Sequence, residues 1–367
     1  MPLKSAGLSG GSAVEVTLAD GLPFGRYSYI SDSVAAVYTD LLTIVARDSA
    51  AAKDLLAQLE RMTPELRATV FRDSLVRRTI EDGVCRILKG VDTIEPAALE
   101  ELLGVTSFAA GRRSRTLLNE DERGVCLGST PDFGYVWIGE QTGTLPGQQF
   151  VDAILKRLPG FRIHSATQNQ IDTLGRGARL AYRAAPTLTD SALSHNFMVV
   201  LGDFEDEEQK FKSLTLPGLP GVLIISPHVL SSDTATAEAL LHEAFHLKFL
   251  DIDYIHPLFT AEFRQETSPR ITPVWHEGDP RLGHWPVDRV LTSMHVYLTL
   301  AVFLEKAAMV EDVPGWEDGA ARSIECRNKA TWLSVAAEDH LNCLTDSGRQ
   351  FVASIRAMLA ELNAPGG

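Results

Sequence analysis

The segment from residue 221 to residue 250 constrains the fold of this chain more than any other. Gly221-Val222-Leu223-Ile224-Ile225 is an apolar run typical of a buried strand. Ser231-Ser232-Asp233 follows as a helix N-cap, and the composition of residues 234–250 is helical. Within this helix, residues 242–246 are His-Glu-Ala-Phe-His, an HExxH motif. The sequence therefore predicts a buried strand followed by a helix that carries two histidines.

The spacing of these histidines indicates a metal site. Residues four apart on a helix lie on one face, one turn apart, so both imidazoles can reach a single divalent cation. His242 and His246 are therefore candidate metal ligands, and Glu243 is a candidate catalytic residue. The chain has ten histidines in 367 residues, so chance rarely produces this motif. A purely structural histidine pair is the alternative.

The remaining pattern predicts a mostly helical α+β fold, with a small sheet packed against the HExxH helix. Residues 1–30 are expected to be irregular, and helical periodicity runs from Ser31 to about Leu103. Further strands are expected at residues 135–138 and 197–201, further helices at 148–158 and 287–306, and two more helices within 319–362. We expect a helical N-terminal region over residues 1–103 and an α+β metal-binding region over 104–367, or one continuous domain.

Two stretches are expected to be loops. Residues 104–147 are rich in Gly, Thr, Arg and Ser, and residues 251–284 combine Pro, Gly, His and charged residues with weak periodicity. A loop as long as the second one is usually functional inside a compact domain.

Composition excludes several classes of protein. The net charge of −14 argues against nucleic acid or an anionic membrane as the main partner. No apolar run approaches the length of a membrane span, and the N-terminus lacks the apolar core of a signal peptide. None of the four cysteines forms a CxxC pair, which argues against a zinc knuckle. We expect a cytoplasmic protein.

A third protein ligand is needed, because two imidazoles alone make a weak site. The metzincin spacing fails, since it requires histidine where this chain has Ile252. Glu262 and Glu266 lie at about the distance expected of a thermolysin-like ligand, whereas His256, before a proline, suits an extended turn. His295 lies in the middle of an apolar helix, where a buried polar ring needs a partner. We favour His295, with a satisfied core histidine as the alternative.

These features together resemble the HExxH-motif peptide-modification proteins, which occur beside biosynthetic genes for ribosomally made, post-translationally modified peptides. The resemblance rests on Leu241 to Leu247, on Trp275-His276-Glu277-Gly278-Asp279-Pro280-Arg281, and on the apolar helix from Leu291 to Phe303. The family pattern has arginine in place of His276 and proline in place of Leu282.

The resemblance implies an iron(II), 2-oxoglutarate-dependent oxygenase that hydroxylates a β-carbon of a precursor peptide. His242, His246 and His295 would form a facial set of ligands, which leaves three positions on iron for the oxo-acid and O2. Arg281 would bind the far carboxylate of 2-oxoglutarate, because its planar fork matches a carboxylate. Its alternatives are Arg289 and Arg264, and any of the three is otherwise a surface arginine.

A zinc metallopeptidase is the rival interpretation. The two motif histidines and Glu262 or Glu266 would then bind zinc, and Glu243 would be the general base acting on metal-bound water. In the oxygenase, Glu243 would instead orient a ligand or bound water, or contact the substrate. Ser213 is a further candidate to face the site. A third class is a non-catalytic peptide-binding protein with a structural metal.

Overall fold

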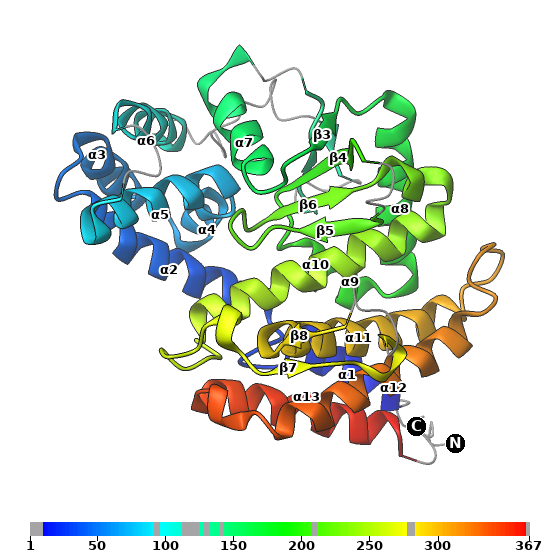
Figure 1. Cartoon of the computed structure of the whole chain (residues 1–367). Coiled ribbons are helices and arrows are strands. Elements are labelled where there is room, and N and C mark those ends of the chain that lie inside the picture. The colour runs from blue at the N-terminus through cyan, green and yellow to red at the C-terminus, as the bar shows by residue number, and fades with distance from the viewer. Residues whose placement is uncertain are drawn as a thin grey trace, which may run out of the picture. The chain divides into compact units, whose positions relative to one another are not determined.

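The computed structural model describes residues 10–91, 96–111, 125–127, 133–139, 143–206, 211–276 and 283–364. The described residues form thirteen α-helices with a small mixed sheet, so the predicted mostly helical α+β class is confirmed (Figure 1). The chain divides into two compact units. Unit 1 comprises Met1–Arg26, Ala181–Ser191 and Ile252–Gly367, and unit 2 comprises Tyr27–Leu180 and Ala192–Asp251.

Unit 2 begins with five helices: α2 (Tyr27–Val45), α3 (Ala50–Leu59), α4 (Pro64–Phe71), α5 (Ser74–Lys89) and α6 (Pro96–Gly111). Their ends have local causes: the Asp73 side chain accepts hydrogen bonds from the first turn of α5, and Gly90 ends that helix at a φ of 64°. Helix α6 continues past Leu103 into the stretch expected to be a loop. In this part of the helix the buried Thr106 hydroxyl donates to the Leu102 carbonyl, so the helix itself supplies the hydrogen-bond partner of this polar group.

The sheet of unit 2 has the strand order β1-β2-β4-β6-β5, and β3 also pairs with β4. The strands are β1 (Val125–Cys126), β2 (Tyr135–Val136), β3 (Phe161–His164), β4 (Met198–Phe204), β5 (Ser213–Thr215) and β6 (Val222–Ile225). Strands β4 and β6 are parallel and almost wholly buried, as expected of the two apolar runs. Strand β5 is antiparallel to β6 and ends the strand order.

Three more helices precede β6 in the sequence: α7 (Leu145–Leu155), α8 (Gln168–Ala184) and α9 (Pro186–Leu193). Residues 181–191, which include most of α9, belong to unit 1. Phe150 and Ile154 of α7 pack with Trp137 and apolar side chains of β4 and β6 in one core cluster. The HExxH helix is α10 (Asp233–Ile255), and the Ser232 hydroxyl accepts a hydrogen bond from the Ala235 N–H at its start. Figure 1 shows α10 running beside β5.

Unit 1 is built from helices α1 (Gly10–Asp20), α11 (Val287–Ala307), α12 (Gly319–Glu338) and α13 (Asp346–Leu362), with a two-stranded ladder of β7 (Arg270–Ile271) and β8 (Trp285–Pro286). The expectation that residues 1–30 are irregular is wrong for α1. Val14 and Leu18 of α1 are buried, and Glu15 pairs with Lys306 at 2.7 Å, so tertiary contacts stabilise this helix.

Helix α11 is the only helix in the described ranges that is long and apolar enough to cross a membrane. However, 67% of the most apolar 18-residue stretch of this helix is buried inside the structure. This burial is typical of a core helix.

Candidate metal centre

The two motif histidines lie together on α10, one turn apart. Their Nε2 atoms are 3.2 Å apart and their ring centroids are 5.0 Å apart. The His242 side chain keeps 38% of its surface exposed, whereas the apolar residues around it on α10, such as Leu241 and Phe245, are buried. The helix is therefore anchored on its other sides while one imidazole stays accessible.

The distance between the two Nε2 atoms fits a shared cation. Two nitrogens at about 2.0–2.1 Å from one metal lie roughly 2.9 to 3.4 Å apart for bond angles between 90° and 109°. The protein around the partly exposed ring excludes water from it, and this desolvation, with a smaller effect of the Lys212 charge, lowers the pKa of His242 below its ordinary value. The ring is therefore neutral at pH 7, which is the form that binds a metal.

Glu243 is held by the neighbouring edge strand. Its side chain is buried, and the hydroxyls of Ser213 and Thr215 donate hydrogen bonds to its carboxylate. Burial raises the pKa of Glu243 to about 7, more than these two hydrogen bonds lower it. Its Oε1 lies 3.8 Å from Nε2 of His242, so the carboxylate is on the side where a metal would bind. A carboxyl group with this pKa can exchange a proton near neutral pH.

The sequence indicated Ser213 as a residue near the site but missed Thr215. The signal was available, because residues two apart on a strand share a face. Recognising it required knowing that residues 213–215 form a strand, which so short a segment does not reveal.

The third ligand stays a prediction from the sequence. Among the residues that the structure describes, no group of three or more His, Cys, Asp or Glu side chains could hold a metal ion. His242 and His246 belong to unit 2, whereas His295 belongs to unit 1.

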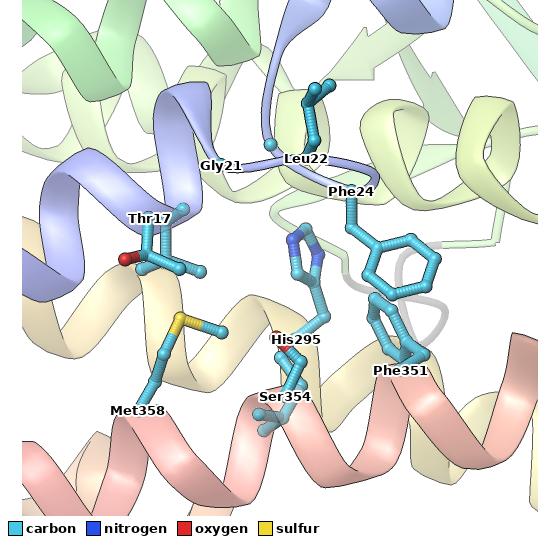
Figure 2. Close-up of a pocket in the computed structure, with 11 residues that line it drawn as sticks. Thr17, Gly21, Leu22, Phe24, His295, Phe351, Ser354 and Met358 are labelled. Atoms are coloured by element: carbon cyan, nitrogen blue, oxygen red, sulfur yellow. The ribbon is translucent and has the colours of Figure 1, made fainter.

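Within unit 1, His295 is a buried residue of α11 next to a small cavity. Figure 2 shows its imidazole beside the rings of Phe24 and Phe351, and the Phe351 ring centroid is 5.9 Å away. The cavity measures about 30 Å³ and is also lined by Ser354 and Met358. This is room for one or two water molecules and is far smaller than a site for an organic ligand.

The candidate third ligands of the rival zinc site, Glu262 and Glu266, lie in unit 1 as well. Glu262 and Glu266 are exposed, and the second helix expected to carry them is replaced by a single 3-10 turn, Gln265–Thr267. Pro269 lies just beyond this turn and does not suit a longer helix. His256 packs edge-on against the Phe24 ring, with centroids 5.6 Å apart, in keeping with the structural role expected of it.

The three arginines proposed to bind the far carboxylate of 2-oxoglutarate differ in their surroundings. Arg281 lies outside the described residues. Arg264 donates to the carbonyls of Ala261 and Phe263 in its own turn. The exposed Arg289 lies with its guanidinium carbon 4.4 Å from the Trp285 ring centroid.

A buried charge network in unit 2, which the sequence did not reveal, holds the end of α10 that belongs to this unit. Arg77 of α5 pairs with Asp251 Oδ1 at 2.8 Å, and His195 Nδ1 lies 2.7 Å from Asp251 Oδ2. All three residues are buried. The Arg77 guanidinium carbon also lies 4.9 Å from the Tyr38 ring centroid, and the Tyr38 hydroxyl donates to Glu81. The network therefore links α10 to α2, α5 and the segment before β4.

No protein-family model matches the sequence, and no curated protein matches it. The functional proposal therefore rests on the residues and geometry of this chain and on the resemblance of its motifs.

Proposed function

We propose that this protein is a metal-dependent enzyme that modifies a peptide. The specific proposal is an iron(II), 2-oxoglutarate-dependent oxygenase that hydroxylates a β-carbon in a ribosomally made precursor peptide. The observation that supports metal binding is the 3.2 Å distance between the Nε2 atoms of the two motif histidines on α10. Iron and 2-oxoglutarate are supported by the resemblance of residues 241–247, 275–281 and 291–303 to HExxH-motif peptide-modification proteins.

In this proposal His242 and His246 hold iron, and His295 is the third ligand assigned from the sequence. Iron(II) with 2-oxoglutarate and O2 would supply the oxidising power for C–H hydroxylation. Glu243, fixed by two hydroxyls of β5, would orient a ligand or the substrate beside His242. Arg281 is the proposed partner of the far carboxylate of 2-oxoglutarate. The proposed compartment is the cytoplasm, with neither nucleic acid nor a membrane as partner.

A zinc peptidase is a second candidate, and Glu243 favours it. A general base works best when its pKa is near the working pH, and burial raises the pKa of Glu243 to about 7. Its carboxylate also lies on the side of His242 where metal-bound water would be activated.

The first experiment loads the apoprotein anaerobically with iron(II), adds 2-oxoglutarate, and records the visible spectrum. A new metal-to-ligand charge-transfer band, missing in His242→Ala, is expected for the oxygenase. Incubation with the precursor peptide should then add the mass of one oxygen. No band together with tightly bound zinc would overturn the proposal in favour of the peptidase.

Substitution of Glu243 separates the two candidates further. Glu243→Gln keeps the size of the side chain and its hydrogen bonding to β5 but cannot accept a proton. A peptidase should lose nearly all cleavage, whereas the oxygenase should keep measurable hydroxylation, because its chemistry requires no carboxylate base. The measurement is turnover by mass spectrometry, with metal content determined on the same samples.

A further inference from the structure

Strand β5 is the edge strand of the described sheet, beside the HExxH helix α10. It is the last strand in the order β1-β2-β4-β6-β5, and in the described part of the chain no other strand pairs with its outer side. Figure 1 shows β5 at the margin of the sheet, next to α10. Its three residues, Ser213 to Thr215, are half-buried. An open edge presents backbone donors and acceptors that can pair with another chain.

The register of β5 against β6 determines which backbone groups point outward. Hydrogen-bonded and non-hydrogen-bonded residue pairs alternate along an antiparallel ladder. The Ser226 N–H donates to the Lys212 carbonyl at 2.9 Å, so Lys212 and Ser226 form a hydrogen-bonded pair. The next such pair is Leu214 with Ile224. The N–H and C=O groups of Ser213 and Thr215 therefore point away from β6.

The same two residues face the candidate metal centre with their side chains. Their hydroxyls donate to Glu243, whose Oε1 is 3.8 Å from His242 Nε2. Leu214 points to the opposite face, where it packs against the core cluster that contains Trp137 and Phe150. Ser213 and Thr215 thus combine an outward backbone with side chains on the metal-binding face.

We propose that an extended segment of the substrate peptide binds along the outer edge of β5 as an added antiparallel strand. The outward backbone groups of β5 indicate a peptide as the ligand. An extended peptide repeats a backbone donor and acceptor at the same spacing as Ser213 and Thr215. Residues opposite each other in a ladder share a face. Alternate peptide side chains therefore point toward Glu243 and the histidine pair. The inference rests on the proposed function only in taking a peptide as the substrate.

A matched pair of variants tests the backbone contribution. Thr215→Val removes the hydroxyl but keeps the outward N–H, whereas Thr215→Pro removes both, and proline is tolerated on an edge strand. The probe is a capped, fluorescein-labelled peptide of alternating threonine and valine flanked by lysines, used with metal-free protein. We expect Thr215→Pro to bind it about two- to tenfold more weakly than Thr215→Val, the effect of one hydrogen bond. Equal binding by both variants overturns the proposal.

Amide hydrogen exchange in the wild-type protein provides a second test that needs no variant. The Ser213 and Thr215 amides should exchange freely without the probe and become protected when it is added, whereas the Leu214 amide should be protected in both states. Failure of the wild type to bind the probe at millimolar concentration, or protection elsewhere only, overturns the proposal. Both tests are made without metal. A positive result beside a failed charge-transfer experiment would therefore reject the oxygenase and leave the peptide site standing.

Discussion

At the scale of single residues, the histidine pair makes the most direct prediction. His242→Ala and His246→Ala should each lose most bound iron or zinc, because the two protein ligands that remain make only a weak site. His228→Ala is the matched control, since His228 is exposed in the turn before α10 and should leave metal content unchanged. Elemental analysis of purified proteins measures the outcome. His295→Ala belongs in the same set, and unchanged metal in that variant would remove His295 as the third ligand.

The buried His195 gives a prediction for pH. Burial lowers the pKa of His195 below its ordinary 6.5, more than the hydrogen bond and charge of Asp251 raise it. The unfolded chain therefore binds more protons than the folded protein just below pH 6.5. Hence the free energy of unfolding should fall as the pH falls below about 6.5.

His195→Asn isolates this effect, because the asparagine amide can still donate to Asp251 but does not titrate. Denaturant unfolding between pH 5 and 7, a range set by the ordinary histidine pKa of about 6.5, should show a shallower pH dependence in this variant than in the wild type. His228→Asn is the control at an exposed position. Parallel pH profiles for wild type and His195→Asn would contradict the assignment.

Single-residue features differed in how far they were predictable. The shared face of His242 and His246 follows from their spacing alone. The Arg77–Asp251–His195 network joins residues distant in the chain, and each of them has an ordinary local sequence context. No periodic pattern marks such a network, so it emerged only from the fold.

At the scale of elements, the pairing of α5 with α10 through Arg77 and Asp251 should be costly to break. Removing one partner of a buried ion pair leaves an unpaired charge and costs about 3–5 kcal/mol. We expect Asp251→Asn and Arg77→Met each to destabilise the protein on this order. The double variant should lose less than the two single losses combined, because no uncompensated charge remains. Additive losses in chemical denaturation would show that the two side chains act independently.

Helix α8 packs closely against α10 at Gly177, because glycine has no side chain. A Cβ added at Gly177 would lie 2.6 Å from Cγ2 of Thr236 on α10. We expect Gly177→Ala to destabilise the protein by about 1–3 kcal/mol through overpacking. Gly104→Ala in α6 is the matched control, because none of the described residues has an atom within 4 Å of the added methyl. That variant should be about 0.5–1 kcal/mol more stable than the wild type, through helix propensity. The same sign for both variants in thermal unfolding would contradict this packing.

Elements with a strong periodic pattern were predicted well. The apolar runs at 197–201 and 221–225 appear as β4 and β6, and the helix predicted over 287–306 appears as α11. Helix α1 and the short strands β3 and β5 were not predicted, because tertiary contacts and cross-strand pairing stabilise them more than local preference does. The loop predicted over 251–284 is interrupted by the end of α10 and by β7.

At the scale of the whole molecule, the two compact units are not continuous stretches of the sequence. The sequence predicts a helical region that ends at residue 103 or one continuous domain, and unit 2 runs through residue 103 as far as Leu180 and resumes at Ala192. Each unit gathers segments that are distant in the chain. A scan for changes in composition cannot detect such a division, because it considers only neighbouring residues.

The Arg77–Asp251–His195 network also limits how this protein can change over generations. Loss of any one partner leaves a buried polar group or charge uncompensated, so single replacements at these three positions should rarely persist. Lineages that depart from the trio should have replaced its members together, with apolar residues of similar volume. Related sequences should therefore vary in concert at positions 77, 195 and 251, whereas position 228, which is exposed here, should vary independently of them.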